Sequence, residues 1–498
     1  MTANGKPGHF GPGSAEGPAG PTQATEIRLT TEWVARAMGG TVRAGDPDRE
    51  FNGVSIDTRT LVAGELFIAI TGERFNGADF ARAAIDAGAG GVVVEHGRGR
   101  ELADQKGVRP LLSGVAIIEV DDATVALQSL AQAIRRASGT KVVAITGSAG
   151  KTTTKEVTGE FLATRYRIVR NRGNFNNHIG LPLSLIELRR RPEIAVVDLG
   201  MNHAGEISTL VRIAEPEVRV WINVGEAHLG FFQSVDAIAD AKAEICEGST
   251  PATLLVANAD DDRITGRASR FKGRVVTFGI DSDADVRATA VRSRGIDGVD
   301  AHVATPRGAF ELTTPLIGRA NLANVLAATA VAIEFDIPLT TIAERAGHLT
   351  PASHRGEVLR LSQGVTVIDD SYNANPTATK RALEVLGEAS DRSRRVAVLG
   401  EMLELGERAN VLHAEVGRAA AKAKIDVVIA VGGEPASALA DAAVAAGIGR
   451  ASVLYVATSD EAADAAATLI RRGDLVLVKG SRGVRTDRVV DRLKAEFA

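Results

Sequence analysis

Residues 141–154 read KVVAITGSAGKTTT and are the most informative part of the sequence. It passes from a run of apolar, mostly β-branched residues through two glycines into helix-forming residues, which predicts a buried strand, a tight turn and a helix. Small residues let the backbone turn sharply, so that successive N–H groups and the helix N-terminus can point at phosphate oxygens. The pattern therefore predicts a loop that binds a nucleoside triphosphate, with Lys151 at the terminal phosphates and Thr152 at Mg²⁺.

The loop departs from the general phosphate-binding pattern at one position. That pattern has a glycine five residues before Gly150, where this chain has Ile145. The shorter form that remains, G-x-x-G-K-T, can also arise as a chance glycine turn. The strand before it and the helix after it favour a phosphate loop. Its expected nucleotide contacts are Gly147, Ser148, Gly150, Lys151, Thr152 and Thr153.

The composition is that of a soluble globular protein. Apolar residues make up 45% of the 498 residues and charged residues 24%, and the net charge of −4 gives no reason to expect a nucleic-acid partner. No run approaches the length of a transmembrane helix. The single cysteine, Cys246, cannot form an internal disulfide, which suits a cytoplasmic protein. Residues 1–25 lack the apolar core of a signal peptide and are expected to form a disordered tail.

Three units follow the tail, with expected boundaries at residues 26–137, 138–350 and 351–498. Short strands alternate with helices in each, which predicts an α/β fold with three domains. The first is a small α/β domain, the second a central parallel-sheet ATPase domain and the third a C-terminal Rossmann-like domain. Strands are expected at 54–59, 66–70, 91–94, 141–145, 195–199, 218–224, 254–257, 275–278, 365–368, 396–399, 427–430, 453–456 and 475–478.

Polar residues gather where the strands of the central unit end. Asp198 ends one strand-like run and His228 follows another. Ligands of an open parallel sheet bind beyond the carboxyl ends of its strands, so both could complete a Mg²⁺ shell. A capping aspartate and a plain loop histidine are the structural alternatives. The arginine run at 189–191 is expected to be a solvated helix end.

Two further loops and one helix carry candidate groups. The amide-rich loop Asn174, Asn176, Asn177 and His178 could grip a polar substrate or simply form turns. The same choice holds for Asn373 and Asn375, which follow the strand that ends at Asp370. Lys242 and Glu244 lie on an expected helix, where their spacing alone favours a surface ion pair.

Together these segments resemble the Mur ligases, the ATP-dependent amide-forming enzymes of peptidoglycan precursor synthesis. The resemblance covers nearly the whole chain from about residue 28. The matching segments are SIDTR at 55–59, GERFNG at 72–77, the phosphate loop, GNFNNHIGLP at 173–182, LGMNH at 199–203, NVGEAHLG at 223–230, NLAN at 321–324, HR at 354–355, DDSYNANP at 369–376 and LGEMLELG at 399–406.

The resemblance implies a role for each domain. The first binds the UDP moiety of the substrate, through a segment that contains Ser55, Thr58 and Arg59. The central domain binds ATP and Mg²⁺, and the third closes over ATP and receives the incoming amine. Closure makes the junctions near Ala137 and Thr350 candidate hinges. The implied ATP contacts beyond the phosphate loop are Asn321, Asn324, Arg355 and Asp370.

The resemblance also implies a metal site and a modified lysine. Thr152, Asp198 and His228 would serve Mg²⁺, and Lys151, His228 and Lys242 would be catalytic. Lys242 falls where the family has a carbamylated lysine, which turns a cation into an anion that helps hold the second Mg²⁺. The family usually has Glu at the position of Asp198, which makes a bridging water plausible there.

Among the branches of the family, residues 370–376 resemble the one that joins D-alanyl-D-alanine to UDP-N-acetylmuramoyl-tripeptide through an acyl phosphate. This reaction belongs to cytoplasmic cell-wall synthesis, and the enzyme is expected to be a monomer. One alternative is the branch that adds the third residue to the dipeptide precursor, whose Asp-Asn-Pro-Arg motif is absent from this sequence. Another is a non-catalytic regulator that binds ATP and signals by closing.

Overall fold

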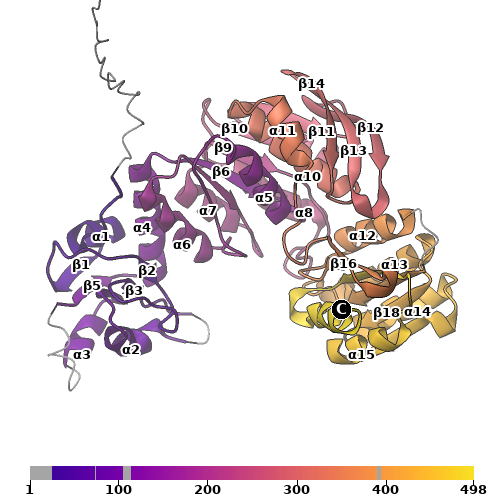
Figure 1. Ribbon diagram of the computed structural model, residues 1–498. Helices are drawn as coiled ribbons and strands as arrows, with labels where there is room; N and C mark the ends of the chain where they lie inside the picture. The colour runs from indigo at the N-terminus through magenta and orange to yellow at the C-terminus, as the bar shows by residue number, and fades with distance from the viewer. Residues whose placement is uncertain (1–24, 73–74, 105–113, 390–393) are drawn as a thin grey trace, which may run out of the picture.

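The computed structural model describes residues 25–72, 75–104, 114–389 and 394–498. The expected tail therefore lies outside the described residues except for Thr25, as do Glu73 and Arg74 of the 72–77 segment. Figure 1 shows three sheet-containing bodies, with the central one between the other two. The expected α/β class with three sheets is confirmed. Within the described part, no helix is long and apolar enough to cross a membrane.

The first sheet has five strands in the order β1-β5-β4-β3-β2, and only β1 runs antiparallel to its neighbour. Its last helix, α4, starts where Asp122 accepts hydrogen bonds from the N–H groups of Thr124 and Val125. The elements are α1 (Thr31–Met38), β1 (Thr41–Ala44), β2 (Val54–Ser55), β3 (Leu66–Ile68), α2 (Ala81–Asp86), β4 (Gly91–Glu95), α3 (Arg98–Asp104), β5 (Ala116–Val120) and α4 (Ala123–Ser138).

The central sheet has nine strands in the order β14-β13-β12-β11-β10-β9-β6-β8-β7. From β7 to β12 neighbours are parallel, as expected, and β13 and β14 add an antiparallel edge outside the expected strands. The strands are β6 (Lys141–Thr146), β7 (Ile168–Arg170), β8 (Ile194–Asp198), β9 (Val218–Trp221), β10 (Leu254–Asn258), β11 (Arg274–Gly279), β12 (Val286–Ser293), β13 (Val299–Thr305) and β14 (Gly308–Thr314).

Helices cover both faces of this sheet because its central strands are apolar on both sides. On β6, Val143 and Ile145 share a core with α5 and α10, while Val142 and Ala144 share one with α4 and α6. The helices are α5 (Lys151–Leu162), α6 (Gly180–Ile186), α7 (Glu206–Ala214), α8 (Val235–Ala243), α9 (Asp262–Ala268), α10 (Gly318–Glu334) and α11 (Leu339–Ala346).

The third sheet has six strands in the order β15-β16-β20-β17-β18-β19, all parallel except β15. Valine-rich strands such as β20 are buried along their whole length, as in a doubly wound domain. The elements are β15 (Glu357–Arg360), β16 (Thr366–Asp370), α12 (Pro376–Glu388), β17 (Arg395–Gly400), α13 (Ala409–Lys422), β18 (Val427–Val431), α14 (Glu434–Ala445), β19 (Val453–Val456), α15 (Ser459–Leu469), β20 (Leu475–Lys479) and α16 (Asp487–Glu496).

The junction between the first two sheets is tightly packed. Helix α4 contacts α1 of the first body and α6 and α7 of the central one. Its buried Arg135 donates to the carbonyls of Ala214 and Glu215. In the arginine run at 189–191, Arg190 is solvated as expected, but Arg189 pairs with Glu26 at 2.5 Å and Arg191 donates to the carbonyl of Thr25. Of the two candidate hinges, these contacts favour the one near Thr350.

Candidate active site

The phosphate loop lies between β6 and α5. Gly150 has a φ of 83°, and a Cβ there would lie 2.6 Å from the Asn324 side-chain oxygen, so this turn requires glycine. No side chain caps the N-terminus of α5. Its first N–H groups are therefore available to an anion, and the helix dipole favours negative charge at the same place.

Asn223, which follows β9, holds the phosphate loop through two hydrogen bonds to its backbone. Its side-chain oxygen accepts from the N–H of Ala149, and its side-chain nitrogen donates to the Ala149 carbonyl, both at 2.9 Å. The hydroxyl of Ser148 accepts from the N–H of Gly225 at 2.9 Å. The sequence interpretation assigned Asn223 no role, although it begins the matching segment at 223–230.

Lys151 begins α5, and its Nζ donates to the Gly147 carbonyl at 2.8 Å. Removal from water lowers the pKa of this amine and outweighs the nearby charge of Asp198, and Arg355 lowers the pKa further. Among the described residues, no carboxylate forms an ion pair with Lys151. Its charge is therefore available to a bound phosphate.

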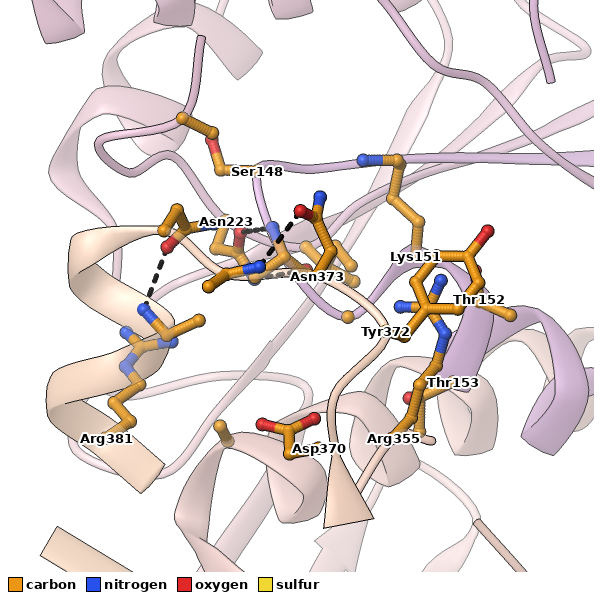
Figure 2. Close-up of a pocket in the computed structure, with 18 of the residues that line it drawn as sticks. Ser148, Lys151, Thr152, Thr153, Asn223, Arg355, Asp370, Tyr372, Asn373 and Arg381 are labelled. Carbon is orange, nitrogen blue, oxygen red and sulfur yellow. Dashed lines mark hydrogen bonds between the residues drawn. The ribbon is translucent and has the colours of Figure 1, made fainter. Parts of the chain in front are cut away.

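A cavity of about 900 Å³ lies between the central and third sheets, in front of the phosphate loop. Figure 2 shows the phosphate loop, Asn223 and side chains of the third domain around it. It collects nearly all of the expected ATP, metal and amide-loop residues. Those on its wall are Ser148, Gly150, Lys151, Thr152, Thr153, Asn174, Asn176, Asn177, His178, Asp198, His228, Asn321, Asn324, Arg355, Asp370, Asn373 and Asn375.

Asp198 is buried, and both of its carboxylate oxygens are engaged. Oδ1 accepts from Asn171 at 3.0 Å and lies 3.2 Å from Lys155 Nζ, and Oδ2 accepts from Asn176 at 2.9 Å. Burial raises the pKa of this carboxyl, but Lys155, the two amides and Lys151 together hold it below its usual value. Asn171 and Lys155 were not found from the sequence.

Replacing Asp198 with asparagine is expected to lower the free energy of unfolding by about 3–5 kcal/mol, because buried Lys155 would lose its nearer and buried carboxylate partner. Thermal unfolding of the variant measures this loss. Asp283→Asn is the control, since Asp283 also pairs with a cation, Arg287, but is fully exposed. Equal melting temperatures for the two variants would contradict the expectation.

Lys242 is the last cation of α8 and is only 1% exposed. Among the described residues it forms no ion pair, and Glu244 instead accepts from the N–H groups of Gly205 and Ser208. A surface ion pair between Lys242 and Glu244 is therefore wrong. Burial, helped by the charge of Lys151, lowers the pKa of Lys242 well below its ordinary value.

His228 is held by a residue of the third domain. Its Nδ1 lies 2.6 Å from Oε2 of Glu404, and its backbone has a φ of 62°. The hydrogen bond to His228 is the main cause that lowers the pKa of Glu404. The sequence places Glu404 in a matching segment but gives no sign of this contact, which joins residues 176 positions apart.

The third domain faces the cavity with paired and stacked groups. Asp370 accepts from Lys479 Nζ at 2.5 Å. The guanidinium of Arg355 lies 3.9 Å from the centre of the Tyr372 ring, and that of Arg482 lies 5.2 Å from it. The sequence assigns no role to Lys479 or Arg482, which lie outside the matching segments, and none to Tyr372, although it lies in the segment 369–376.

Some of the expected substrate residues serve the backbone. Asn177 accepts from the N–H groups of Ile179 and Gly180, and Asn375 caps α12 by accepting from Ala378. Asn373 accepts from the N–H of its neighbour Ala374. At these three positions the turn interpretation describes the contacts present in the structure.

Ser55, Thr58 and Arg59 lie in the first domain and do not line this cavity. Ser55 accepts from the N–H of Asp57, and Arg59 donates to both carboxylate oxygens of Asp57. The Arg59 hydrogen bonds lower the pKa of Asp57 to about 2. The segment is a charged turn, and its role in binding stays a prediction.

Buried His413 holds the loop that carries Glu404, because its Nε2 accepts from the N–H of Met402 at 2.8 Å. Burial lowers its pKa. The folded state thus binds fewer protons than the unfolded one, so this stabilisation is complete above about pH 6.5 and is lost as pH falls through the folded pKa.

His413→Leu is therefore expected to cost about 1–3 kcal/mol of stability at neutral pH, since the Met402 N–H loses its acceptor. The variant should also lose less stability than the parent between pH 7.5 and pH 5. Thermal unfolding at both pH values, with exposed His348→Leu as control, measures both effects. Parallel pH profiles for parent and His413→Leu would refute the second expectation.

Three family descriptions match the chain. They are "Mur ligase family, catalytic domain" at residues 50–135, "Mur ligase middle domain" at 145–332 and "Mur ligase, glutamate ligase domain" at 354–482. Curated UDP-N-acetylmuramoyl-tripeptide–D-alanyl-D-alanine ligases are 33% identical in both Bacillus subtilis and Escherichia coli. The alignments cover 94% of this chain in each case, and 98% and 99% of those proteins.

Solved structures agree with these matches. MurF from Acinetobacter baumannii has a TM-score of 0.83 and 29% identity, over 95% of this chain and all of that one. MurF from Thermotoga maritima in complex with ADP has a TM-score of 0.76 and 28% identity, over 89% of this chain and 97% of that one. The chain therefore belongs to the Mur ligase family.

Proposed function

We propose that the protein is an ATP-dependent ligase that joins D-alanyl-D-alanine to UDP-N-acetylmuramoyl-tripeptide. The observation that carries this proposal is the single cavity in which the phosphate loop faces polar groups of the third domain. Such a cavity can hold ATP, an activated carboxylate and an amine together. The names of the curated relatives supply the two substrates.

The chain's own residues suit the nucleotide. The N-terminus of α5 and Lys151 would bind the phosphates, and Asn321 and Asn324 stand next to Gly150 on α10. Arg355 and Asp370 would contact ATP from the third domain. Catalysis of phosphoryl transfer consists mainly of positioning and charge neutralisation, which are the roles that these groups can fill.

The donor set fits Mg²⁺ only in part. Thr152 and Asp198 border the cavity with oxygen atoms, but the described residues contain no group of three or more acidic, histidine or cysteine side chains that could hold a metal ion. Both Asp198 oxygens already accept hydrogen bonds, so Asp198 would hold Mg²⁺ through a water more readily than directly. When bound, Mg²⁺ would neutralise charge on the phosphates.

Lys242 would supply the missing anion. Burial lowers the pKa of Lys242 and so favours the neutral amine, the form that can add to CO₂ and release a proton to give a carbamate. The added charge would be opposite to that of Lys151, which is close enough to lower the pKa of Lys242. Lys242 does not itself line the cavity, and a carbamate on it would add an anion near Lys151 to the oxygen atoms of Thr152 and Asp198.

The reaction would proceed in two steps. A carboxylate oxygen of the tripeptide attacks the γ-phosphorus of ATP, and ADP leaves with the electron pair of the broken bond. The amine of the dipeptide then attacks the acyl carbon, loses a proton and expels phosphate. Lys151 and Arg355 can stabilise the oxyanion of this second step. Closure of the third domain would exclude the water that hydrolyses an acyl phosphate.

Binding of the rest of the donor falls to other residues. Ser55, Thr58 and Arg59 would contact the uridine nucleotide, and Asn174, Asn176 and His178 the part of the donor near the cavity. Both substrates of the proposed reaction are cytoplasmic metabolites, so we place the protein in the cytoplasm. We expect it to act as a monomer, because both domains that form the cavity belong to one chain.

ADP release by the purified full-length chain tests the proposal. With ATP, Mg²⁺ and the tripeptide donor, release should depend on D-alanyl-D-alanine, and mass spectrometry should detect the UDP-muramoyl pentapeptide. Equal release without the dipeptide would overturn the ligase assignment and favour a regulator. A product formed only from the dipeptide precursor with diaminopimelate or lysine would favour the other branch.

A further inference from the structure

Two loops from different domains meet at the edge of the cavity. One is the loop 223–231 after β9, and the other is the loop 401–406 after β17. They touch through Glu404, whose carboxylate contacts His228 and whose carbonyl accepts from the N–H of Gly230 at 2.7 Å. The proposed ATP and metal contacts do not use this residue.

We propose that Glu404 is a positioning residue that holds the His228 imidazole in place only when the third domain is closed. Closure of the third domain would then also orient the His228 imidazole. This inference rests on the proposed ligase function and adds a residue to it.

Two short hydrogen bonds join the loops at Glu404, one through its side chain and one through its backbone. Glu404 Oε2 lies 2.6 Å from His228 Nδ1, so Nδ1–H donates to the carboxylate, and the backbone bond from Gly230 lies beside it. A Cβ on Gly230 would lie 3.1 Å from the Glu404 carbonyl oxygen, so the close approach depends on glycine. A carboxylate on one ring nitrogen of a histidine sets the tautomer and leaves the other nitrogen free to act.

Backbone strain accompanies the contact. His228 has a φ of 62° and Glu404 a φ of 64°, both in the left-handed region that residues with a side chain rarely adopt. Each such residue costs of the order of 1 kcal/mol and persists only where its surroundings hold it. Here both strained residues lie at the contact between the two domains.

Each loop is anchored within its own domain. Loop 223–231 is bound to the phosphate loop through Asn223 and Gly225. Loop 401–406 is bound to its domain through Met402, whose N–H donates to His413, and Leu403, whose N–H donates to Ser481. A shift of the third domain therefore moves Glu404 relative to His228 and the phosphate loop.

The pair is too exposed to serve the fold. The side chains are 20% exposed at His228 and 44% at Glu404, and ion pairs with this exposure contribute little to stability. A second, longer ion pair joins the two domains: Lys380 of α12 lies 3.7 Å from Glu226 of loop 223–231. The tight contact at His228 therefore points to a role in the site.

Four variants of the full chain test the inference: Glu404→Ala, Glu404→Gln, His228→Ala and the double variant Glu404→Ala/His228→Ala. Exposed Glu407→Ala, three residues away, is the control, because the Glu407 carboxylate forms no hydrogen bond or ion pair among the described residues. We expect Glu404→Ala to lower kcat by about 10- to 100-fold. Gln can still accept from Nδ1–H, so it should restore part of the rate. The melting temperatures of the four variants should equal that of the Glu407→Ala control.

Three further outcomes decide the inference. Adding Glu404→Ala to His228→Ala should cause no further loss of rate, because the effect passes through the imidazole. The single variant Glu404→Ala should release more ADP than peptide product, since an incompletely closed site admits water that hydrolyses the acyl phosphate. In ¹⁵N-histidine NMR, with His228→Ala to assign the signal, the ring should show the Nδ1–H tautomer in the parent and lose this preference in Glu404→Ala.

Glu404→Ala with the kcat of the control and an unchanged His228 signal would overturn the inference. Additive effects in the double variant would do the same. If the parent chain makes no peptide product at all, the proposed function fails. The NMR signal then still decides whether Glu404 positions His228.

Discussion

Replacing Lys151 with alanine is expected to lower kcat by on the order of 10²–10³-fold, the usual cost of losing one charged group that stabilises a transition state. Lys151 stands at the N-terminus of α5, donates to the loop carbonyl of Gly147 and forms no ion pair among the described residues. Phosphoryl transfer moves negative charge towards this position, so its amine acts mainly in the transition state.

Steady-state kinetics with saturating substrates measures the effect. Lys272→Ala, a change of an exposed lysine elsewhere in the same domain, is the control. The Lys151 variant should keep the parent melting temperature, because its burial lowers the pKa of the amine and so brings no stability that its removal would forfeit. A kcat within about tenfold of the parent would mean that the phosphates bind elsewhere.

Replacing Lys242 with alanine is expected to reduce activity by a similar factor, on the order of 10²–10³-fold, for a different reason. This lysine is 1% exposed, and burial lowers its pKa, which favours the neutral amine that a carbamate requires. Its loss would remove an anion from the metal site. Lys242→Met, of nearly equal length, separates this chemical role from packing.

Added bicarbonate or a short-chain carboxylate should restore part of the activity to Lys242→Ala, where space is left for it. The longer methionine should block that rescue. Rates measured with and without the additive, for both variants and the parent, provide the comparison. Full activity of Lys242→Ala would exclude the carbamate.

The fold was predictable wherever strands are buried on both faces. The strands β6 and β20 are runs of Val, Ile and Leu that a period-2 or continuous apolar pattern identifies, and they begin and end within one or two residues of expectation. By contrast, β12 has five half-buried or exposed residues among its last six, such as Thr289 and Arg292, so its pattern is weak. For this reason β12 is absent from the expected strands.

The site residues likewise fall into those that the sequence indicates directly and those that it does not. The phosphate loop is local, and its residues alone indicated phosphate binding. Most other roles came from the resemblance, because they depend on residues far apart in the chain. The contacts of Asp198 with Asn171 and Lys155, and of His228 with Glu404, span 27, 43 and 176 positions and follow only from the packed sheets. The pair with Lys155 also gives Asp198 a structural role. Because this role occupies its carboxylate, Asp198 is less suited to bind a metal ion directly.

Isotope transfer tests the central claim, that ATP on the phosphate loop activates a carboxylate. The tripeptide donor is prepared with ¹⁸O in both oxygens of the carboxylate to be coupled, and the released phosphate is analysed by mass spectrometry. An acyl phosphate requires that one labelled oxygen passes into each phosphate and that the other remains in the new amide. Unlabelled phosphate released together with peptide product would contradict the account.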